Sequence, residues 1–369
     1  MIDFTSSLYL GLRHDSGSVP GWAQLTTGVP AALAVAPAAG TLEQALAGLI
    51  GTEAATLAPS TLHAFWDLFT AMSALEIHVD AGTYPIGWWG AERAHCSGAA
   101  VQPFRHHDPA ALRRAVVGRG SSRNSGSRRL VVLTDGFCPG CGRIAPIDRY
   151  LAIVAPVGGL VVVDDTQALG VLGTQAAGQP YGRGGGGITR WLQVSSPHLL
   201  VVASLAKGFG VPLATVAGSE AAVRRYVARS ETRVHCSPPS NAHLHAALEA
   251  LHSSAKRGDA LRRRLAGLVS LLRAMLGALG VPLTPGMFPV QSIGADTGVD
   301  LEMVHLQLAE LGVRTVLNRP RCRQGIALTF IVTAAHRETD LTQLGRALKV
   351  AMPVRSDIDR GTLMRVAAK

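Results

Sequence analysis

Two stretches decide the fold: residues 160–173 read LVVVDDTQALGVLG, and residues 199–212 read LLVVASLAKGFGVP. Each begins with a continuous apolar run and then turns abruptly polar and glycine-containing. Continuous apolar runs are typical of strands in a parallel sheet that is covered on both faces. The sequence therefore predicts a buried strand in each stretch, with Asp164 ending the first, and Ser204 and Lys207 just after the second.

Apolar runs of the same kind predict further strands at 130–134 and 213–217. Helices are expected between the strands, for example at 109–118, where Asp-Pro opens the helix and Gly ends it. Strands that alternate with helices indicate an α/β fold with a mainly parallel sheet. Two turn-rich segments, 119–129 and 179–187, are expected to be mobile surface loops.

The distribution of predicted helices and strands along the chain indicates three regions. An N-terminal arm, 1–40, precedes a large α/β domain at 41–280, and a small C-terminal α+β domain follows at 281–369. The boundary near residue 281 follows two long helical stretches, 241–256 and 260–279, after which only shorter strand and helix units occur.

Composition and charge exclude several classes of function. The chain of 369 residues has a formal net charge of +10, but its basic residues are mostly scattered arginines and only 5% of residues are aromatic. A surface that stacks single-stranded bases needs aromatic and basic side chains together, so we expect no nucleic-acid partner. Charged residues, glycine or proline interrupt every apolar run before the length of about 20 residues that a membrane helix needs.

The first residues and the cysteines indicate a compartment. MIDFTSSLYLGLRH has an acid at position 3 and no basic segment before an apolar core, so we expect no signal peptide. Five cysteines are an odd number for a disulfide framework. These features favour a cytoplasmic protein with reduced thiols and no membrane contact.

Several segments, in matching order and spacing, resemble the fold-type-I pyridoxal-5′-phosphate (PLP) enzymes, and within them the α-oxoamine synthase family. FTSSLYLGL (4–12) resembles the family's N-terminal segment, and TLEQALAGLIGTEAATLAPS (41–60) resembles the helix and strand before its phosphate turn. VVDDTQALGVLG (162–173) is similar to Asp-Asp-Ala-His-x-x-Gly-Val-x-Gly, and ASLAKGFG (203–210) to Thr-x-Ser-Lys-x-x-Gly. VTAAHRETDL (332–341) is similar to Ser-Ala-Ala-His-Thr-x-x-Asp-Ile. The resemblance covers essentially the whole chain.

The resemblance implies roles at the two strand ends. Lys207 would hold PLP as a Schiff base and then act as the general base at the substrate's Cα. Asp164 would pair with the pyridinium nitrogen and keep it protonated, which makes the ring an electron sink. Ser204 corresponds to a hydroxyl that binds the cofactor phosphate.

Further cofactor contacts are implied nearer the N-terminus. Ser60, Thr61 and Leu62 fall where the family's phosphate turn opens a helix, whose free N–H groups and dipole favour an anion. Tyr84 takes the place of the family's ring-stacking histidine and keeps an aromatic surface there, although a tyrosine packed in the core is the alternative.

Three positions depart from the family pattern. Gln167 replaces a histidine beside the cofactor's phenolic oxygen and can donate a hydrogen bond, but it cannot act as an acid or base. Pro139 replaces a serine near the same oxygen. Thr329 replaces the arginine that binds the substrate carboxylate. Either Arg319, from the arginine cluster at 319–323, joins Thr329 at the substrate, or the substrate is not a simple α-amino acid.

The sequence Cys138-Pro139-Gly140-Cys141-Gly142 has the shape of a metal knuckle. A structural zinc site needs four ligands, and no second Cys-x-x-Cys exists; only the pairs 95–96 and 235–236, each His-Cys, suggest themselves as partners. A redox-active pair and ordinary loop residues are the alternatives. We favour loop residues and predict no metal ligand.

The resemblance implies an α-oxoamine synthase-like C-acyltransferase. Such an enzyme forms an aldimine with an amino substrate, generates a Cα carbanion and condenses it with an acyl thioester, carried by CoA or an acyl carrier protein. The resemblance also implies a homodimer in which segment 236–240 reaches the partner's phosphate site. The alternatives are a PLP-dependent aminotransferase or lyase/decarboxylase, and a scaffold protein of this fold that has lost its cofactor.

Overall fold

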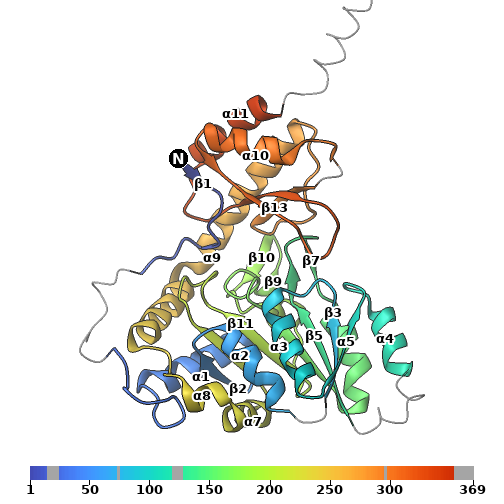
Figure 1. The fold of residues 1–369 in the computed structure, drawn as a ribbon. Helices are drawn as coiled ribbons and strands as arrows, with labels where there is room; N and C mark the ends of the chain where they lie inside the picture. Colours follow the sequence, from blue (N-terminus) through green and yellow to red (C-terminus); the bar gives the residue numbers. More distant parts are fainter. Residues whose placement is uncertain (15–24, 73–74, 119–127, 295–296, 353–369) are drawn as a thin grey trace, which may run out of the picture.

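The structure is a computed structural model that describes residues 1–14, 25–72, 75–118, 128–294 and 297–352. A seven-stranded sheet is covered by helices on both faces, and a three-stranded sheet with two helices lies above it in Figure 1. The fold is α/β with a mainly parallel sheet, as the sequence predicts. The expected mobility of segment 119–129 concerns residues that, except for the last two, lie outside the described ranges.

The predicted apolar runs at 130–134, 160–164, 199–203 and 213–217 form four adjacent strands of the large sheet, and its other three strands were not predicted from such runs. In spatial order, its strands are β2 (Ala54–Ala58), β12 (Ala214–Gly218), β11 (Leu199–Ser204), β8 (Leu160–Asp164), β5 (Arg129–Asp135), β3 (Leu75–Asp80) and β4 (Ala100–Phe104). Only β12 runs against its neighbours. The connection from β11 to β12 covers residues 205–213 and is too short for the crossover that a parallel pair requires.

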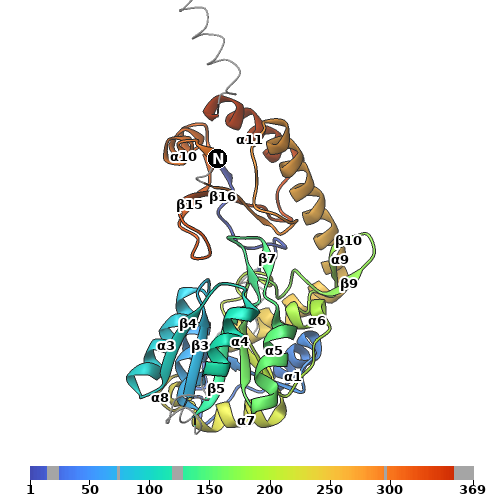
Figure 2. The same ribbon diagram turned by 90° about the vertical axis from the view of Figure 1, so that its right-hand side faces the viewer.

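Helices cover both faces of this sheet (Figure 2). One face packs against α2 (Thr61–Thr70), α3 (Pro85–Cys96) and α7 (Glu220–Arg229), and the other against α1 (Ala38–Ile50), α4 (Pro109–Gly118) and α5 (Ile147–Val154). Along β8, Val161 and Val163 enter one core while Val162 enters the other. This burial on both faces is why the strand sequence is apolar without interruption.

One long helix, α9 (Asn241–Ala278), replaces the two helices predicted at 241–256 and 260–279. Gly258 lies inside this helix, where a Cβ would meet Ser254 Oγ at 2.7 Å and Arg262 Nη2 at 2.8 Å. The buried Arg262 pairs with Asp259 at 2.7 Å and donates a hydrogen bond of 2.8 Å to the carbonyl of Gly170. Glycine here admits a buried arginine, so the prediction of a break was wrong.

Within the described ranges, no helix combines the length and apolar character that a membrane crossing requires.

The segment 179–187 is ordered, so the prediction of a flexible surface loop was wrong. Its first residues form β10 (Gln179–Arg183), which pairs with β9 (Thr174–Ala176), and the run then leads into the short α6 (Ile188–Leu192). Gly185, Gly186 and Gly187 are buried. A Cβ at Gly186 would lie 2.3 Å from the Leu49 carbonyl oxygen. The glycines therefore allow a close backbone approach, which composition alone cannot distinguish from mobility.

The small sheet is antiparallel, with the order β13 (Val290–Gly294), β16 (Ala327–Ile331) and β15 (Val316–Asn318), and it packs with α10 (Leu301–Glu310) and α11 (Glu338–Ala351). The N-terminal strand β1 (Ile2–Asp3) pairs in parallel with β14 (Val313–Arg314) beside it. The N-terminal residues therefore belong spatially with the C-terminal ones. The division of the chain at residues 40 and 280 stays a prediction.

Candidate active site

Three acidic strand ends meet at the carboxyl edge of the large sheet. Asp164 of β8 is in register with Asp135 of β5 and with Val202 of β11, two residues before Ser204. Asp80 ends the next strand, β3. Parallel strands all end at the same edge of a sheet. The order of the strands is therefore enough to bring the polar residues that follow them together.

Asp164 and Lys207 form the charged centre of this edge. The Asp164 carboxylate is buried and accepts a hydrogen bond of 2.9 Å from the backbone N–H of Thr166. Burial raises the pKa of Asp164, while this hydrogen bond and the charge of Lys207 lower it. Burial lowers the pKa of Lys207 against the opposing charges of Asp164 and Asp135. A lysine with a lowered pKa has a larger neutral, nucleophilic fraction near neutral pH.

Tyr84 lies over the lysine. Its ring centroid is 6.0 Å from Lys207 Nζ, and the residue is 54% exposed, so Tyr84 is not packed in the core. The backbone N–H of Tyr84 lies 3.1 Å from both carboxylate oxygens of Asp135. Sequence reasoning missed Asp135, although it ends an apolar run just as Asp164 does. Burial, followed by the charge of Asp164, raises the pKa of Asp135.

The N-terminus of α2 opens at the same edge. Ser60 is its N-cap: the Ser60 hydroxyl accepts a hydrogen bond from the backbone N–H of His63 and also contacts the His63 ring at 2.8 Å. Thr61 is buried and Leu62 is 41% exposed. The register joins β2 to β12 through Ala58 and Ala214, and Ala214 to Ser204. The helix start therefore faces the same edge as Ser204, and its first-turn N–H groups suit an anion.

A hydroxyl that sequence reasoning missed connects the two central strand ends. The Thr166 hydroxyl oxygen accepts a hydrogen bond of 3.0 Å from the backbone N–H of Ser204, and the Ser204 hydroxyl accepts one of 3.2 Å from Ala206. These bonds fix the turn that leads from Ser204 to Lys207.

Gln167 is held by the N-terminal segment. The Tyr9 hydroxyl donates a hydrogen bond of 2.5 Å to Gln167 Oε1. Tyr9 is fully buried, and burial raises its pKa, so it remains a neutral donor. With its oxygen engaged, the Gln167 side chain presents its NH₂ group as a donor. The SLYLGL motif thus reaches the site through Tyr9, which sequence reasoning did not assign.

The two residues predicted at the substrate lie in different surroundings. Thr329 is buried in β16, where its hydroxyl bonds to Ser292 Oγ at 2.8 Å and to Asn318 Oδ1 at 3.0 Å. Arg319 is exposed in the connection between β15 and β16. That connection reaches α3, because the guanidinium of Arg321 lies 5.6 Å from the Trp88 ring centroid. Figure 2 shows it descending toward the elements of the large sheet.

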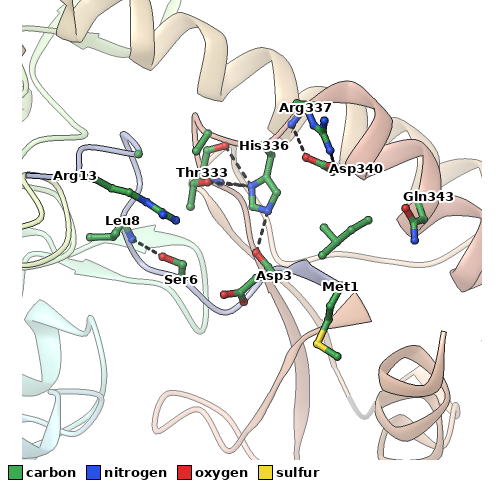
Figure 3. A pocket seen from close by; sticks show the side chains of 13 residues that line it. Met1, Asp3, Ser6, Leu8, Arg13, Thr333, His336, Arg337, Asp340 and Gln343 are labelled. Carbon is green, nitrogen blue, oxygen red and sulfur yellow. Dashed lines mark hydrogen bonds and ion pairs between the residues drawn. The ribbon is translucent and has the colours of Figure 1, made fainter. Parts of the chain in front are cut away.

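The cavity shown in Figure 3 lies elsewhere and contains none of the predicted site residues. It has a volume of about 390 Å³ and lies between the N-terminal segment and residues 333–343. His336, from the VTAAHRETDL motif, bonds at 2.9 Å to the Asp3 carbonyl oxygen, and Phe4 stacks on its ring at 4.5 Å. The motif therefore attaches the N-terminal segment to the small sheet.

The residues at the sheet edge suit a phosphorylated pyridine aldehyde. They supply an amine at Lys207, a buried carboxylate at Asp164, an aromatic face at Tyr84 and an open helix N-terminus at Ser60. Each feature matches one part of PLP: the aldehyde, the ring nitrogen, the ring face and the phosphate.

The chain belongs to the aminotransferase class I and II family, whose model matches residues 5–348. Enzymes of this family use PLP, and the donor set at the sheet edge fits that cofactor.

Its curated relatives include two 8-amino-7-oxononanoate synthases. The protein from Aromatoleum aromaticum is 32% identical over 68% of this chain and 62% of its own length. The protein from Sodalis glossinidius is 29% identical over 95% of this chain and 88% of its own length. The match to the first of these thus spans less than two thirds of that relative.

Solved structures share the fold at low identity. A serine palmitoyltransferase variant from S. paucimobilis with a bound PLP–myriocin aldimine superposes with a TM-score of 0.78 at 17% identity, covering 95% of this chain and 88% of that one. The 8-amino-7-oxononanoate synthase from Francisella tularensis gives a TM-score of 0.70 at 19% identity, covering 95% and 96%. These likenesses agree with the α/β architecture described above.

Proposed function

We propose that this protein is a PLP-dependent C-acyltransferase of the α-oxoamine synthase type, which joins an amino acid to the acyl group of a thioester. The observation that carries the proposal is the grouping of Lys207, the buried Asp164 and the exposed Tyr84 ring at one sheet edge. The names of the curated relatives support an acyl transfer over the other reactions of the family.

The chain's own residues would bind the cofactor at its ends and its face. The first turn of α2 and the Ser204 hydroxyl would hold the phosphate, Asp164 the ring nitrogen, and Tyr84 one face of the ring. Bound there, PLP supplies an electron sink that stabilises negative charge at the substrate's α-carbon. Gln167, oriented by Tyr9, would donate a hydrogen bond to the cofactor but take no proton.

Lys207 would carry out the proton transfer. Its amine lies among the charges of Asp164 and Asp135, and burial lowers its pKa, so that it can accept a proton from the substrate's α-carbon. Asp135 would act indirectly, because its carboxylate fixes the backbone at Tyr84 and thereby the start of α3.

The proposed partners follow from charge and exposed apolar surface. A formal charge of +10 attracts anionic donors such as acyl-CoA or an acylated carrier protein. A homodimer would cover Leu62, Trp66 and Trp89, which are 41%, 42% and 51% exposed on α2 and α3. In such a dimer, segment 236–240 would reach the partner's phosphate site. Light scattering tests the dimer, and an active monomer would contradict it. The cytoplasmic location stays a prediction.

The experiment for the reaction is a two-substrate assay. Purified protein with PLP is offered a panel of amino acids, each with and without acyl-CoA donors, and free thiol release is followed. We expect thiol release that requires both substrates and is absent in Lys207→Ala. Amino transfer to a 2-oxo acid, or elimination from the amine alone, would instead identify an aminotransferase or a lyase.

A further inference from the structure

Four metal-binding side chains gather beside the candidate active site. The ligand atoms of His106, Cys138, Cys141 and Cys322 all lie within 4.8 Å of one another. His106 Nε2 lies 3.4 Å from Cys141 Sγ. In a tetrahedral zinc site with bonds of about 2.0–2.3 Å, neighbouring ligand atoms are separated by roughly 3.5–3.8 Å. A small contraction of this cluster would therefore complete such a site.

The cysteines come from a hairpin and from a distant loop. Cys138 ends β6 (Phe137–Cys138), which pairs with β7 (Arg143–Ile144), and the Cys138 carbonyl accepts a hydrogen bond of 2.9 Å from the Gly142 N–H. A Cβ at Gly140 would lie 2.6 Å from Cys322 Sγ. Glycine at this position thus lets the third sulfur approach the turn between the first two, as a metal knuckle requires.

The histidine is held in the manner of a metal ligand. His106 Nδ1 lies 2.6 Å from Oδ1 of Asp80, a carboxylate that is 1% exposed. Two backbone N–H groups, from Gly82 and His107, also bond to Asp80 at 2.8 and 2.9 Å. With Nδ1 donating to the carboxylate, Nε2 is left with its lone pair directed toward Cys141, the arrangement typical of a carboxylate–histidine–zinc unit.

We propose that Cys138, Cys141, Cys322 and His106 bind one Zn²⁺ ion, with Asp80 orienting the histidine. Three thiolates and one imidazole are a set that selects zinc over magnesium or calcium, which prefer oxygen ligands. All four ligands are buried or half-buried, which shields the ion from solvent. The charges of Arg143 and Arg323 act on the sulfurs and would offset the excess negative charge of three thiolates.

Such an ion would fasten two separate parts of the molecule together. Cys138 and Cys141 belong to the hairpin that follows β5, whereas Cys322 lies in the connection between β15 and β16. The same connection carries Arg319 and the Arg321 that lies against Trp88. The zinc would therefore fix this arginine-bearing connection next to the start of α3, and its role would be structural because all four coordination positions are filled by protein.

The first test is the metal content of the whole protein purified without chelators or an affinity metal. We expect about one zinc per chain by elemental analysis, in line with a closed four-ligand site. Cys322→Ser and His106→Ala should lose it, whereas Cys96→Ser, Cys236→Ser and His107→Ala should retain it. Cobalt substituted for zinc should give the visible bands of a tetrahedral thiolate site in the wild type and in these three control variants, and not in Cys322→Ser.

Asp80→Asn tests the positioning role. It leaves all four ligands in place, so it should retain zinc but bind it about 10- to 100-fold more weakly in a competition with a chromophoric chelator. A metal-free wild type with a disulfide between Cys138 and Cys141, detected by thiol counting, would overturn the proposal in favour of a redox pair. Zinc retained by both Cys322→Ser and His106→Ala would overturn the ligand assignment. Neither outcome depends on the proposed acyl transfer.

Discussion

The cofactor corner around Asp164 and Lys207 and the zinc cluster around Cys138 lie at the same edge of one sheet, yet they are built differently. The residues of the cofactor corner follow neighbouring strands, so strand order alone brings them together. The zinc cluster takes one residue from just after β4, two from the β6–β7 hairpin that follows β5, and one from a loop between strands of the other sheet. The first kind of site can be recognised from local sequence; the second depends on how two sheets are placed.

Lys207→Ala has the largest expected effect. Removal of the proposed general base should lower kcat by about 10²–10⁴-fold or more, and borohydride reduction should no longer attach a pyridoxyl group to the chain. In the wild type, mass spectrometry should find that group on Lys207; finding it on another lysine would refute the assignment. Zinc content should be unchanged, and Cys322→Ser should in turn still be labelled at Lys207. Loss of zinc in Lys207→Ala together with loss of labelling in Cys322→Ser would show that the cofactor corner and the zinc cluster are not independent.

Asp164→Asn is expected to have the next largest effect. Loss of a charged hydrogen bond to the ring nitrogen, about 1.5–3 kcal/mol, should lower kcat roughly 10- to 100-fold while cofactor binding survives. Its neighbour Asp165 offers a matched control, because the Asp165 carboxylate bonds to the Ile188 N–H instead. Asp165→Asn should keep kcat within a few-fold. An equal loss of kcat in both variants would mean that any buried carboxylate here matters, and that pairing of Asp164 with the ring nitrogen does not.

Asp165 also gives a prediction for pH. Burial, partly offset by the hydrogen bond from Ile188, raises the pKa of Asp165 well above its usual range. The folded state then holds a proton that the unfolded state releases, so this group's contribution to stability falls as pH rises from about 4 toward the raised value. The free energy of unfolding of Asp165→Asn, measured with urea, should therefore rise relative to that of the wild type as the pH increases from 5 to 7. A constant difference across that range would contradict the shift.

Tyr9→Phe tests whether the N-terminal segment orients Gln167. The substitution leaves the Gln167 oxygen without its donor and should cost about 1–3 kcal/mol of unfolding free energy. It should also weaken PLP binding, measured by equilibrium dialysis. The control Phe4→Leu, which alters the contact with His336 and not the one with Gln167, should weaken PLP binding less. Unaltered PLP affinity would mean that Gln167 needs no orienting partner.

The smallest effects are expected in the arginine-bearing connection. Arg321→Ala removes a contact with Trp88 and should cost about 0.5–1 kcal/mol in stability. If Arg319 binds the substrate carboxylate, Arg319→Ala should weaken the binding of an amino acid more than the binding of its decarboxylated amine. Because the Thr329 hydroxyl is engaged with Ser292 and Asn318, Thr329→Ser should leave the ratio of these two affinities unchanged. If no variant in the cluster alters the ratio, an unusual substrate becomes the better explanation.

The sequence by itself determined four adjacent strands of the large sheet and their polar edge. Continuous apolar runs specify strands buried on both faces, and residues that directly follow such strands must lie at the carboxyl edge. Asp164, Ser204 and Lys207 could be placed there from local pattern alone. Asp135 could have been found by the same rule, because it ends β5 in the same way.

Only the tertiary structure decided what depends on contacts between distant segments. The glycines at 184–187 and Gly258 give the composition of a loop or a break, but Gly185 and Gly186 admit a neighbouring backbone and Gly258 a buried arginine. The zinc cluster needs Cys322 and His106, and the turn at Cys138 could predict a knuckle but not its partners. Sequence spacing carries no information about which loop of the small sheet meets which hairpin of the large one, because packing between the two sheets sets that distance.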